Sequence, residues 1–275
     1  MEHRRPGGAP PQDGVAAICL ATPGRPRPRL GGWRPNGAHG PGCLPRCARS
    51  RARRHPILTY LPDVYSSIAI EGGIGAGKTT FATWLAEELG AELMLERFEE
   101  NPFLEKFYDN PEAHGFSVEL SFLADRYKQM QSAIRGRNLF KQRMVADYSF
   151  VKSLIFAKVN LPKDEFNLFK TMFTMMHAQL PQPEVVAILD PGRVRQEAQI
   201  VKRGRSYEQS LPEGYLDRVA TGYAAHYKHA RGSRVLWIDT SELDFVAQPE
   251  ALLLLKDAVL APRKPGVHRF QVTAS

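Results

Sequence analysis

A glycine-rich segment is the feature of this sequence that most constrains its fold. Residues 72–79 read GGIGAGKT and match the pattern G-x-x-x-x-G-K-[ST]. The apolar run at 66–71 predicts a strand before this segment, and the spacing of apolar residues at 80–89 predicts a helix after it. Glycines let such a loop curl until its N–H groups point inward, and the helix N-terminus adds a dipole that favours an anion. The sequence therefore predicts a loop that binds nucleotide phosphates.

The residues of this loop differ in what they offer to a nucleotide. We expect the Lys78 ammonium to reach the β- and γ-phosphates and the Thr79 hydroxyl to coordinate Mg²⁺. The chain has no N-K-x-D sequence of the kind that reads guanine in GTPases, which disfavours that class. The residues that we expect to contact ATP are Gly72, Gly73, Ile74, Gly75, Ala76, Gly77, Lys78, Thr79 and Thr80.

Strand and helix patterns alternate along the rest of the chain. Helical spacing is clearest at 115–134 and 164–179. This alternation predicts a three-layer P-loop α/β sandwich, in which a five-stranded parallel sheet lies between helices. We expect the folded domain to cover 63–262, followed by a short tail at 263–275. The five predicted strands are at 66–71, 92–95, 144–147, 185–189 and 235–239.

The N-terminal segment, residues 1–62, has the composition of a disordered tail. It is rich in Pro and Gly and poor in large apolar residues, so it cannot bury enough surface to offset the entropy of ordering. Residues 1–55 contain eleven Arg and two acidic residues, and they account for the formal net charge of +8 of the whole chain. The rest is close to neutral, so the charge gives no reason to expect the folded domain to bind nucleic acid or a membrane.

Several interpretations of the N-terminal segment stay open. It is a solvated tail or the translation of sequence upstream of the true start, a targeting peptide, a basic arm for nucleic acid, or a metal site. The metal site would use Cys43 and Cys47 with His39 or His55. All three cysteines lie in this segment, which excludes a disulfide framework for the folded part and favours the cytoplasm. No stretch of the chain approaches the roughly 18 apolar residues that cross a bilayer.

Four further clusters carry a resemblance to a known family. They read ERFEENPFL at 96–104, ELSFLADRY at 119–127, DYS at 147–149 and KRGRSYEQ at 202–209. With the glycine-rich segment, they resemble the deoxynucleoside kinases, most of all the bacterial deoxyadenosine and deoxyguanosine kinases and the kinase modules fused behind a pteridine pyrophosphokinase. The resemblance covers about 66–246. It implies ATP- and Mg²⁺-dependent phosphorylation of the 5′-hydroxyl of a deoxynucleoside.

The resemblance implies roles for five residues on the acceptor side. Glu96 would be the general base that accepts the 5′-hydroxyl proton as this oxygen attacks the γ-phosphorus. Tyr108 and Glu208 would hold the sugar 3′-hydroxyl, because a phenol and an ionised carboxylate both bond well to a hydroxyl. Glu119 and Arg126 would line the pocket for the nucleoside.

The resemblance also implies roles on the donor side. Asp147 follows an apolar strand and would bind Mg²⁺ or its water shell. Arg203 and Arg205 would lie on a mobile helical lid near 199–210 and close over ATP. Together with Lys78, their permanently charged guanidinium groups would neutralise the charge that the γ-phosphate gains during transfer.

The chain departs from the family pattern at four positions. Tyr148 stands where the family commonly has Arg, and another cation, such as Arg126, would have to compensate. Gln199 replaces the first lid arginine, and Ser153 stands where relatives often have an Asp that helps to choose the base. Many members have Gln where this chain has Glu119. An ionised Glu offers only acceptors, which favours purines with donor edges unless the group is protonated. These departures leave the reaction class intact and the base preference open.

Two alternatives remain beside deoxynucleoside phosphorylation. A nucleoside monophosphate kinase of the thymidylate type shares the P-loop, but Glu96 and Glu119 would repel an acceptor phosphate. A non-catalytic nucleotide-binding protein would depend on the basic tail and not on Lys78. The resemblance further implies a homodimer.

Overall fold

Helices and strands alternate in the computed structural model as the sequence predicts. The structure describes residues 65–98, 101–136, 143–228, 230–245 and 248–271. The expectations for residues 1–62, including the metal site at Cys43 and Cys47, lie outside the described residues.

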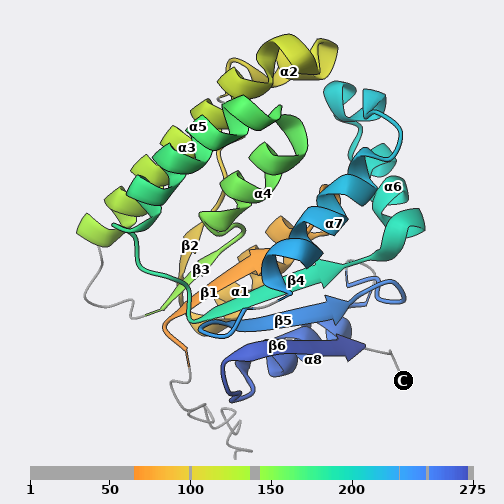
Figure 1. The fold of residues 1–275 in the computed structure, drawn as a ribbon. Helices are drawn as coiled ribbons and strands as arrows, with labels where there is room; N and C mark the ends of the chain where they lie inside the picture. Colours follow the sequence, from red (N-terminus) through yellow and green to blue (C-terminus); the bar gives the residue numbers. More distant parts are fainter. Residues whose placement is uncertain (1–64, 99–100, 137–142, 229, 246–247, 272–275) are drawn as a thin grey trace, which may run out of the picture. The chain divides into compact units, whose positions relative to one another are not determined.

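Six strands form one parallel sheet in the order β2-β3-β1-β4-β5-β6 (Figure 1). The central strands β1 and β4 are rich in Ile and Val and almost fully buried, as expected for strands that are covered on both faces. Ligands bind beyond the carboxyl ends of such strands, where the connections leave for opposite faces of the sheet. The bounds are β1 Ser67–Glu71, β2 Glu92–Met94, β3 Met144–Ala146, β4 Val185–Asp190, β5 Arg234–Asp239 and β6 Gly266–Gln271.

The strand β6 is one more than the five that we expected. It pairs in parallel with β5 and lies within 263–275, so this segment is not a tail throughout. Val267 and Phe270 pack against the hydrophobic core, whereas Arg269 and Gln271 are exposed. Charged and polar residues on an edge strand hinder pairing with other chains, and they also weaken the apolar pattern by which a strand is found in a sequence.

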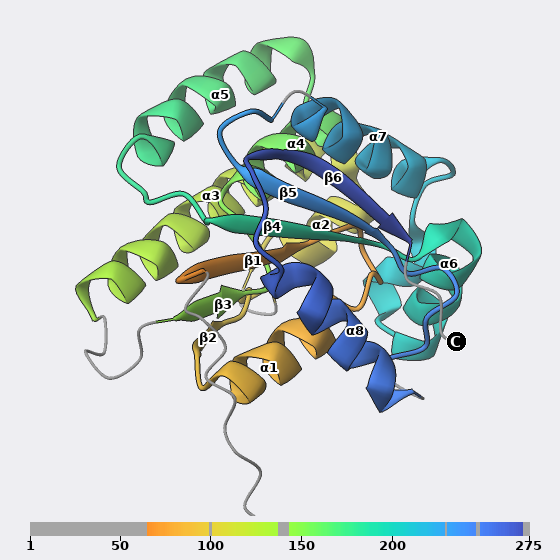
Figure 2. The ribbon, with the colours of Figure 1, turned by 90° about the horizontal axis from the view of Figure 1, so that it is seen from below.

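Helices cover both faces of the sheet (Figure 2). One face packs against α1 and α8, and the other packs against α4, α6 and α7. Helices α3, α4 and α5 share a further apolar cluster above that second face. Within the described part of the chain, no helix is long and apolar enough to cross a membrane. The bounds are α1 Lys78–Leu89, α2 Leu104–Asp109, α3 Pro111–Arg135, α4 Val151–Asn160, α5 Lys163–His177, α6 Gly192–Arg203, the 3₁₀ helix η1 Ser206–Ser210, α7 Tyr215–Tyr227 and α8 Pro249–Leu260.

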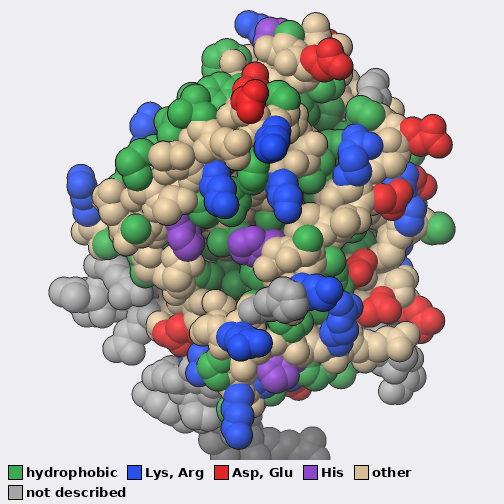
Figure 3. Space-filling view, viewed as in Figure 1, with side chains coloured by type: hydrophobic (Ala, Val, Ile, Leu, Met, Phe, Trp, Pro, Cys, Tyr) green, Lys and Arg blue, Asp and Glu red, His purple; other side chains and the backbone are tan. Residues whose placement is uncertain are grey.

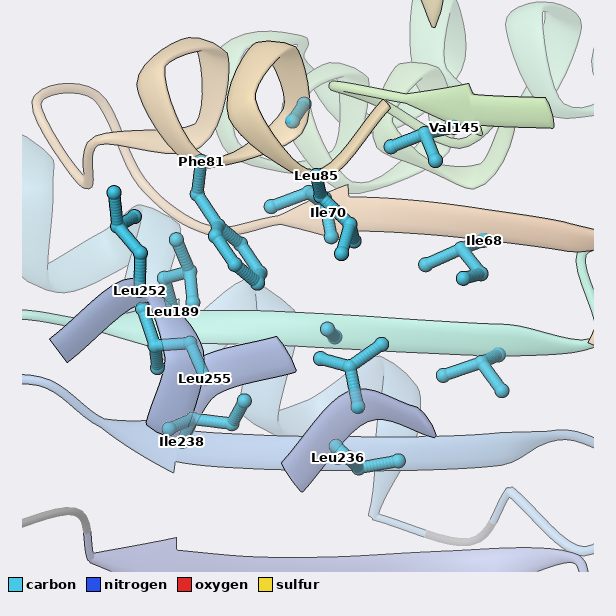
Figure 4. Close-up of a cluster of buried hydrophobic side chains, with 14 of the residues drawn as sticks. Ile68, Ile70, Phe81, Leu85, Val145, Leu189, Leu236, Ile238, Leu252 and Leu255 are labelled. Carbon is cyan, nitrogen blue, oxygen red and sulfur yellow. The ribbon is translucent and has the colours of Figure 1, made fainter. Parts of the chain in front are cut away.

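The largest core lies between the sheet and the helices α1 and α8 (Figure 4). Phe81 and Leu85 of α1 meet Ile70 of β1, and Leu255 of α8 packs on Ile238 of β5. All five side chains are completely buried. Burial of each side chain of this size contributes roughly 1.5–3 kcal/mol. This core therefore gives the loops at the carboxyl edge of the sheet a rigid base.

Candidate active site

The glycine-rich loop joins β1 to α1 at the carboxyl edge of the sheet. Gly77 has a φ of 79°, and a Cβ at this position would lie 2.4 Å from the ring of Phe245, so the backbone angle and the space both require glycine. Lys78 begins α1, and its Nζ donates a hydrogen bond of 2.8 Å to the carbonyl oxygen of Gly73. Burial lowers the pKa of Lys78 to about 8, and the ammonium of Lys152 acts in the same direction. The loop thus holds the predicted lysine over its own backbone.

Asp147, just after β3, forms hydrogen bonds with the residue that follows Lys78 in α1 and with the segment after β2. Its Oδ2 accepts a hydrogen bond of 2.8 Å from the Thr79 hydroxyl, and its Oδ1 accepts one of 2.8 Å from the backbone N–H of Glu96. Only 5% of Asp147 is exposed. Two strong bonds to a buried carboxylate fix the ends of β1, β2 and β3 against one another.

The oxygen atoms of Thr79 and Asp147 fit a magnesium ion that is also held by phosphate and water. Mg²⁺ in nucleotide sites usually takes one or two protein oxygens and completes its shell with phosphate and water. In the described ranges, no cluster of three or more His, Cys, Asp or Glu side chains could hold a metal unaided. The donor set therefore suits a metal that arrives with a nucleotide.

Glu96, just after β2, lies between two cations. Its Oε1 accepts hydrogen bonds of 2.9 and 2.5 Å from Nε and a terminal nitrogen of Arg126, and its Oε2 accepts one from the Lys152 ammonium. Burial alone would raise the pKa of Glu96, but the charges of Lys152 and Arg126 outweigh it and hold this pKa well below the usual carboxyl range. Glu96 is therefore ionised throughout the physiological pH range.

Lys152 is a site residue that sequence analysis missed. It lies in the first turn of α4, 6% exposed, with its ammonium 5.6 Å from the centre of the Phe156 ring. A lysine in a helix is usually solvated, so the sequence alone gave no reason to select it. The only signal was indirect: with Tyr148 in place of an arginine, the site lacked a cation.

Tyr148 itself points into the core and not into the site. It is fully buried beside Met94, and its hydroxyl donates a hydrogen bond of 2.7 Å to Oε1 of Gln129. The amide of Gln129 in turn donates to the carbonyl oxygen of Leu95 at 2.8 Å. We expected Arg126 to supply the missing charge; the structure has Arg126 and Lys152 together at Glu96.

Glu119, on α3, lies in the wall of the same cavity. It is 3% exposed, and its Oε1 accepts a hydrogen bond of 2.6 Å from the amide of Asn160. Its Oε2 is buried and has no hydrogen-bond partner. Burial raises the pKa of Glu119 to about 7, against the opposing effects of Asn160 and of the Arg126 charge. Ser153, the other departure at the base end, accepts a 2.7 Å hydrogen bond from Arg126.

The predicted lid residues gather around Glu208. Arg203, the last residue of α6, and Arg205 both form ion pairs with this carboxylate, which is 5% exposed. Arg205 also lies over the ring of Phe98, 3.7 Å from its centre. Tyr108 of α2 stacks on Tyr207 with ring centres 5.3 Å apart, so that α2 and η1 lie side by side.

One cavity brings the predicted side chains together. It extends from the glycine-rich loop to the wall of α3, and Phe122, Phe156, Asn160 and Tyr215, which sequence analysis missed, also line it. The aromatic rings among these residues give flat apolar surfaces beside a few polar groups, as is usual for a small-molecule site. The predicted residues that line this cavity are Ile74, Lys78, Thr79, Glu96, Tyr108, Glu119, Arg126, Asp147, Arg203, Arg205 and Glu208.

The outer surface of the folded part carries charges of both signs. Figure 3 shows basic side chains over the middle of one face and acidic side chains along one side of it. The mixture agrees with the near-neutral composition of the chain after residue 55. It gives no support to a nucleic-acid site on this face, which would need a continuous basic surface.

Solved structures of one relative match the fold. The structure of deoxyadenosine kinase from M. mycoides with bound dATP has a TM-score of 0.59 and 28% sequence identity, and the match covers 68% of this chain and 97% of that one. The same kinase with bound dCTP matches with a TM-score of 0.59 and 26% identity, over 70% and 99% of the two chains.

Curated relatives match the sequence over nearly the same region. Deoxyguanosine kinase from Bacillus subtilis (strain 168) is 34% identical over 183 residues, which are 65% of this chain and 88% of that protein. Deoxyadenosine/deoxycytidine kinase from the same organism is 27% identical over 202 residues, which are 70% and 91% of the two chains. The family model for deoxynucleoside kinase matches residues 68–259. The chain therefore belongs to the deoxynucleoside kinase family and is an enzyme of that class.

Proposed function

We propose that this deoxynucleoside kinase uses ATP and Mg²⁺ to phosphorylate the 5′-hydroxyl of a purine deoxynucleoside. One observation carries the proposal: a phosphate-binding loop and a buried, ionised carboxylate line the same cavity and are linked through Asp147. Phosphoryl transfer needs positioning and charge neutralisation more than covalent chemistry from the protein. The residues around this cavity are of the types that supply both.

Glu96 would orient the 5′-hydroxyl and accept its proton. The depressed pKa of Glu96 makes it a weak base in the empty site. In a loose transition state the attacking oxygen loses its proton late, when its acidity has risen, so a weak base that is always ionised is adequate. Arg126 holds this carboxylate in place through two nitrogen atoms.

Lys78 and the lid arginines would neutralise the transferred phosphoryl group. Lys78 lies at the loop, and Arg203 and Arg205 lie across the same cavity. Mg²⁺ held by Thr79 and Asp147 would, when bound, offset further charge on the phosphates. To do this, Arg203 and Arg205 would have to break their ion pairs with Glu208 and bind the phosphates instead. This change of partner would accompany closure of the predicted lid.

The sugar and the base would bind in the half of the cavity that faces α3. Tyr108 and Glu208, which both line this cavity, would hold the 3′-hydroxyl. Phe122 and Phe156 offer flat surfaces to a base, and Glu119 offers acceptor oxygens to its edge. These acceptors support a preference for purines, as do the deoxyguanosine and deoxyadenosine kinases among the relatives.

A coupled assay of ADP release from ATP and Mg²⁺ tests this function with four acceptors: deoxyguanosine, deoxyadenosine, deoxycytidine and thymidine. We expect ADP with one or both purines. Lys78→Ala and Glu96→Gln should lower kcat by about 10²-fold or more, whereas the exposed Lys170→Ala on α5 should leave it unchanged. Activity on dTMP without activity on any deoxynucleoside would support the thymidylate-type alternative, and ATP binding without transfer would support the non-catalytic one.

We also propose, from the resemblance, that the protein is a cytoplasmic homodimer. Light scattering from the purified full chain tests the oligomeric state, and a mass of one chain of 30.8 kDa would contradict it.

A further inference from the structure

One oxygen of the Glu119 carboxylate accepts a hydrogen bond within the protein, and the other has no hydrogen-bond partner. Asn160, the last residue of α4, bonds to Oε1 at 2.6 Å, which sets the plane of the carboxylate. Oε2 is buried, lies in the wall of the cavity and accepts no hydrogen bond. A buried acceptor without a partner is destabilising, because it has lost its hydrogen bond to water and gained none in return. A ligand that brings a donor to this oxygen would remove that cost.

The charged groups around Glu119 come from three sides. Arg126 lies on the same helix, Lys152 on α4 and Glu96 beyond β2, and the phenol of Tyr215 on α7 faces Glu119 beside Asn160. Both cations are already bonded to Glu96. They therefore act on Glu119 through charge alone and do not occupy its free oxygen.

The bases differ in what they present to such a carboxylate. Guanine has two adjacent donors, the N1–H and the 2-amino group, so it can satisfy an ionised carboxylate. Adenine and cytosine present an amino group beside a ring nitrogen whose lone pair would face the carboxylate. A site that is built to pair polar groups rejects a ligand that leaves those groups unpaired, by factors of up to about 10⁴–10⁵.

We propose that ionised Glu119, oriented by Asn160, selects guanine over adenine by accepting hydrogen bonds from N1–H and the 2-amino group, one at the free Oε2 and the other at the remaining lone pair of Oε1. The inference rests on the proposed function and names the base for that same site. It also gives a specific reason for an acid at a position where an amide would serve either purine, because an amide offers both a donor and an acceptor.

Protonation of Glu119 would reverse the preference. The neutral acid can donate to the ring nitrogen of adenine and accept from its amino group. Burial raises the pKa of Glu119 to about 7, so the ionised fraction rises from about 10% at pH 6 to about 90% at pH 8. The ratio of kcat/KM for deoxyguanosine to that for deoxyadenosine should therefore rise about 100-fold between these pH values. Titration of Lys78 affects both substrates alike and cancels in the ratio.

The test measures this ratio at pH 6, 7 and 8 for the full-length wild type, Glu119→Gln and the exposed Glu112→Gln on the same helix. Glu119→Gln should give a ratio that is flat with pH and at least about 10-fold lower than the wild type at pH 8. Glu112→Gln should behave as wild type. Deoxyinosine, which lacks the 2-amino group, should fall between the two purines at pH 8.

A wild-type ratio that is flat with pH and matches that of Glu119→Gln would overturn the inference, even if the enzyme phosphorylates both purines. Calorimetric titration of each protein with deoxyguanosine and deoxyadenosine at pH 6 and 8 gives the same ratio from binding alone. If no deoxynucleoside is phosphorylated, the proposed function fails, and the binding ratio still decides whether Glu119 discriminates between the bases. An equal binding ratio at both pH values would overturn the inference in that event too.

Discussion

Replacing Lys152 with methionine removes one of the two cations that hold Glu96. Methionine keeps most of the length and apolar surface of the side chain, so the stem can still pack in α4 beside Phe156. The change leaves Arg126 as the one remaining ion-pair partner of Glu96 among the described residues. The variant therefore tests the charge at position 152 with little change in packing.

The structure sets the size of the expected effect. A hydrogen bond to a charged group contributes about 1.5–3 kcal/mol, and Arg126 prevents the larger loss that an unpaired buried charge would cause. If the transition state uses this charge fully, about 1.5–3 kcal/mol corresponds to a fall in kcat of about 13–160-fold. The KM for the nucleoside should change less than kcat, because Lys152 bonds to Glu96 and acts on Glu119 only through its charge.

The pH profile separates this role from a structural one. The Lys152 charge lowers the pKa of Glu96, so its loss should move the acid limb of kcat upward, toward the ordinary carboxyl value of about 4.3. The same charge lowers the pKa of Lys78, so the basic limb should also move upward. Steady-state kinetics from pH 4 to 10 should show the basic limb of both proteins, and an acid limb from Glu96 near the lower end of the range in the variant alone.

The matched control for this variant is Lys158→Met on the same helix, where the lysine is exposed and we expect no change in kcat or in either limb. Thermal unfolding checks that Lys152→Met is folded. A folded Lys152→Met with wild-type kcat and unmoved limbs would refute the reasoning that Lys152 acts on Glu96.

Three further predictions concern other parts of the site and its support. Because the pKa of Lys78 is lowered to about 8, its positive charge is present below that pH and lost above it; kcat/KM for ATP should fall above pH 8, and a value constant to pH 9.5 would contradict this. Tyr223→Phe should lower the free energy of unfolding in urea by about 1.5–3 kcal/mol, since the Tyr223 hydroxyl donates 2.7 Å to the buried Glu71; a change below 0.5 kcal/mol would show that this bond contributes little. Binding of a deoxynucleoside at Glu208 should free the two lid arginines and so raise the affinity for a non-hydrolysable ATP analogue by about 5-fold or more. Calorimetry with and without the nucleoside measures this affinity, and equal values would show that Glu208 does not couple the two sites.

Much of the fold followed from local patterns. The strand, glycine-rich loop and helix at the start of the folded part appear where the sequence predicts them, with α1 beginning two residues earlier, at Lys78. The other four predicted strands agree to within one residue at each end. These segments carry strong apolar patterns because both faces of a parallel sheet are covered. The weak pattern of β6, with His268 and Arg269 in its middle, is the reason that it was missed.

The site was predicted where a residue type has a fixed chemical role in a local motif. Lys78, Thr79 and Asp147 lie together as expected, because the glycine-rich loop follows β1, Asp147 follows β3, and the two strand ends meet at one edge of the sheet. Lys152 and Asn160 were missed because they lie on α4, and their roles depend on how that helix packs over the cavity. Glu119 was predicted to line the pocket. Its hydrogen bond to Asn160 on α4 and its unpaired Oε2 could not be predicted, because both depend on how α3 and α4 pack.

Tyr148 and Lys152 show that a charge expected at one motif position can come from a different residue. The resemblance implies a cation at position 148, but here the side chain of Tyr148 points away from the site and donates a hydrogen bond to Gln129 in the core. In the first turn of the next helix, Lys152 places its ammonium at the Glu96 carboxylate, which such a cation would contact. A buried Glu96 needs compensating charge wherever that charge comes from, because an unpaired carboxylate in a buried site is costly. In this chain the charge of Glu96 is therefore balanced by Arg126 and Lys152 and not by the residue at position 148. When an expected motif residue is absent, the side chains that contact its expected partner should therefore be examined first. One of them can supply the same charge, so the absence alone does not show that the function is lost.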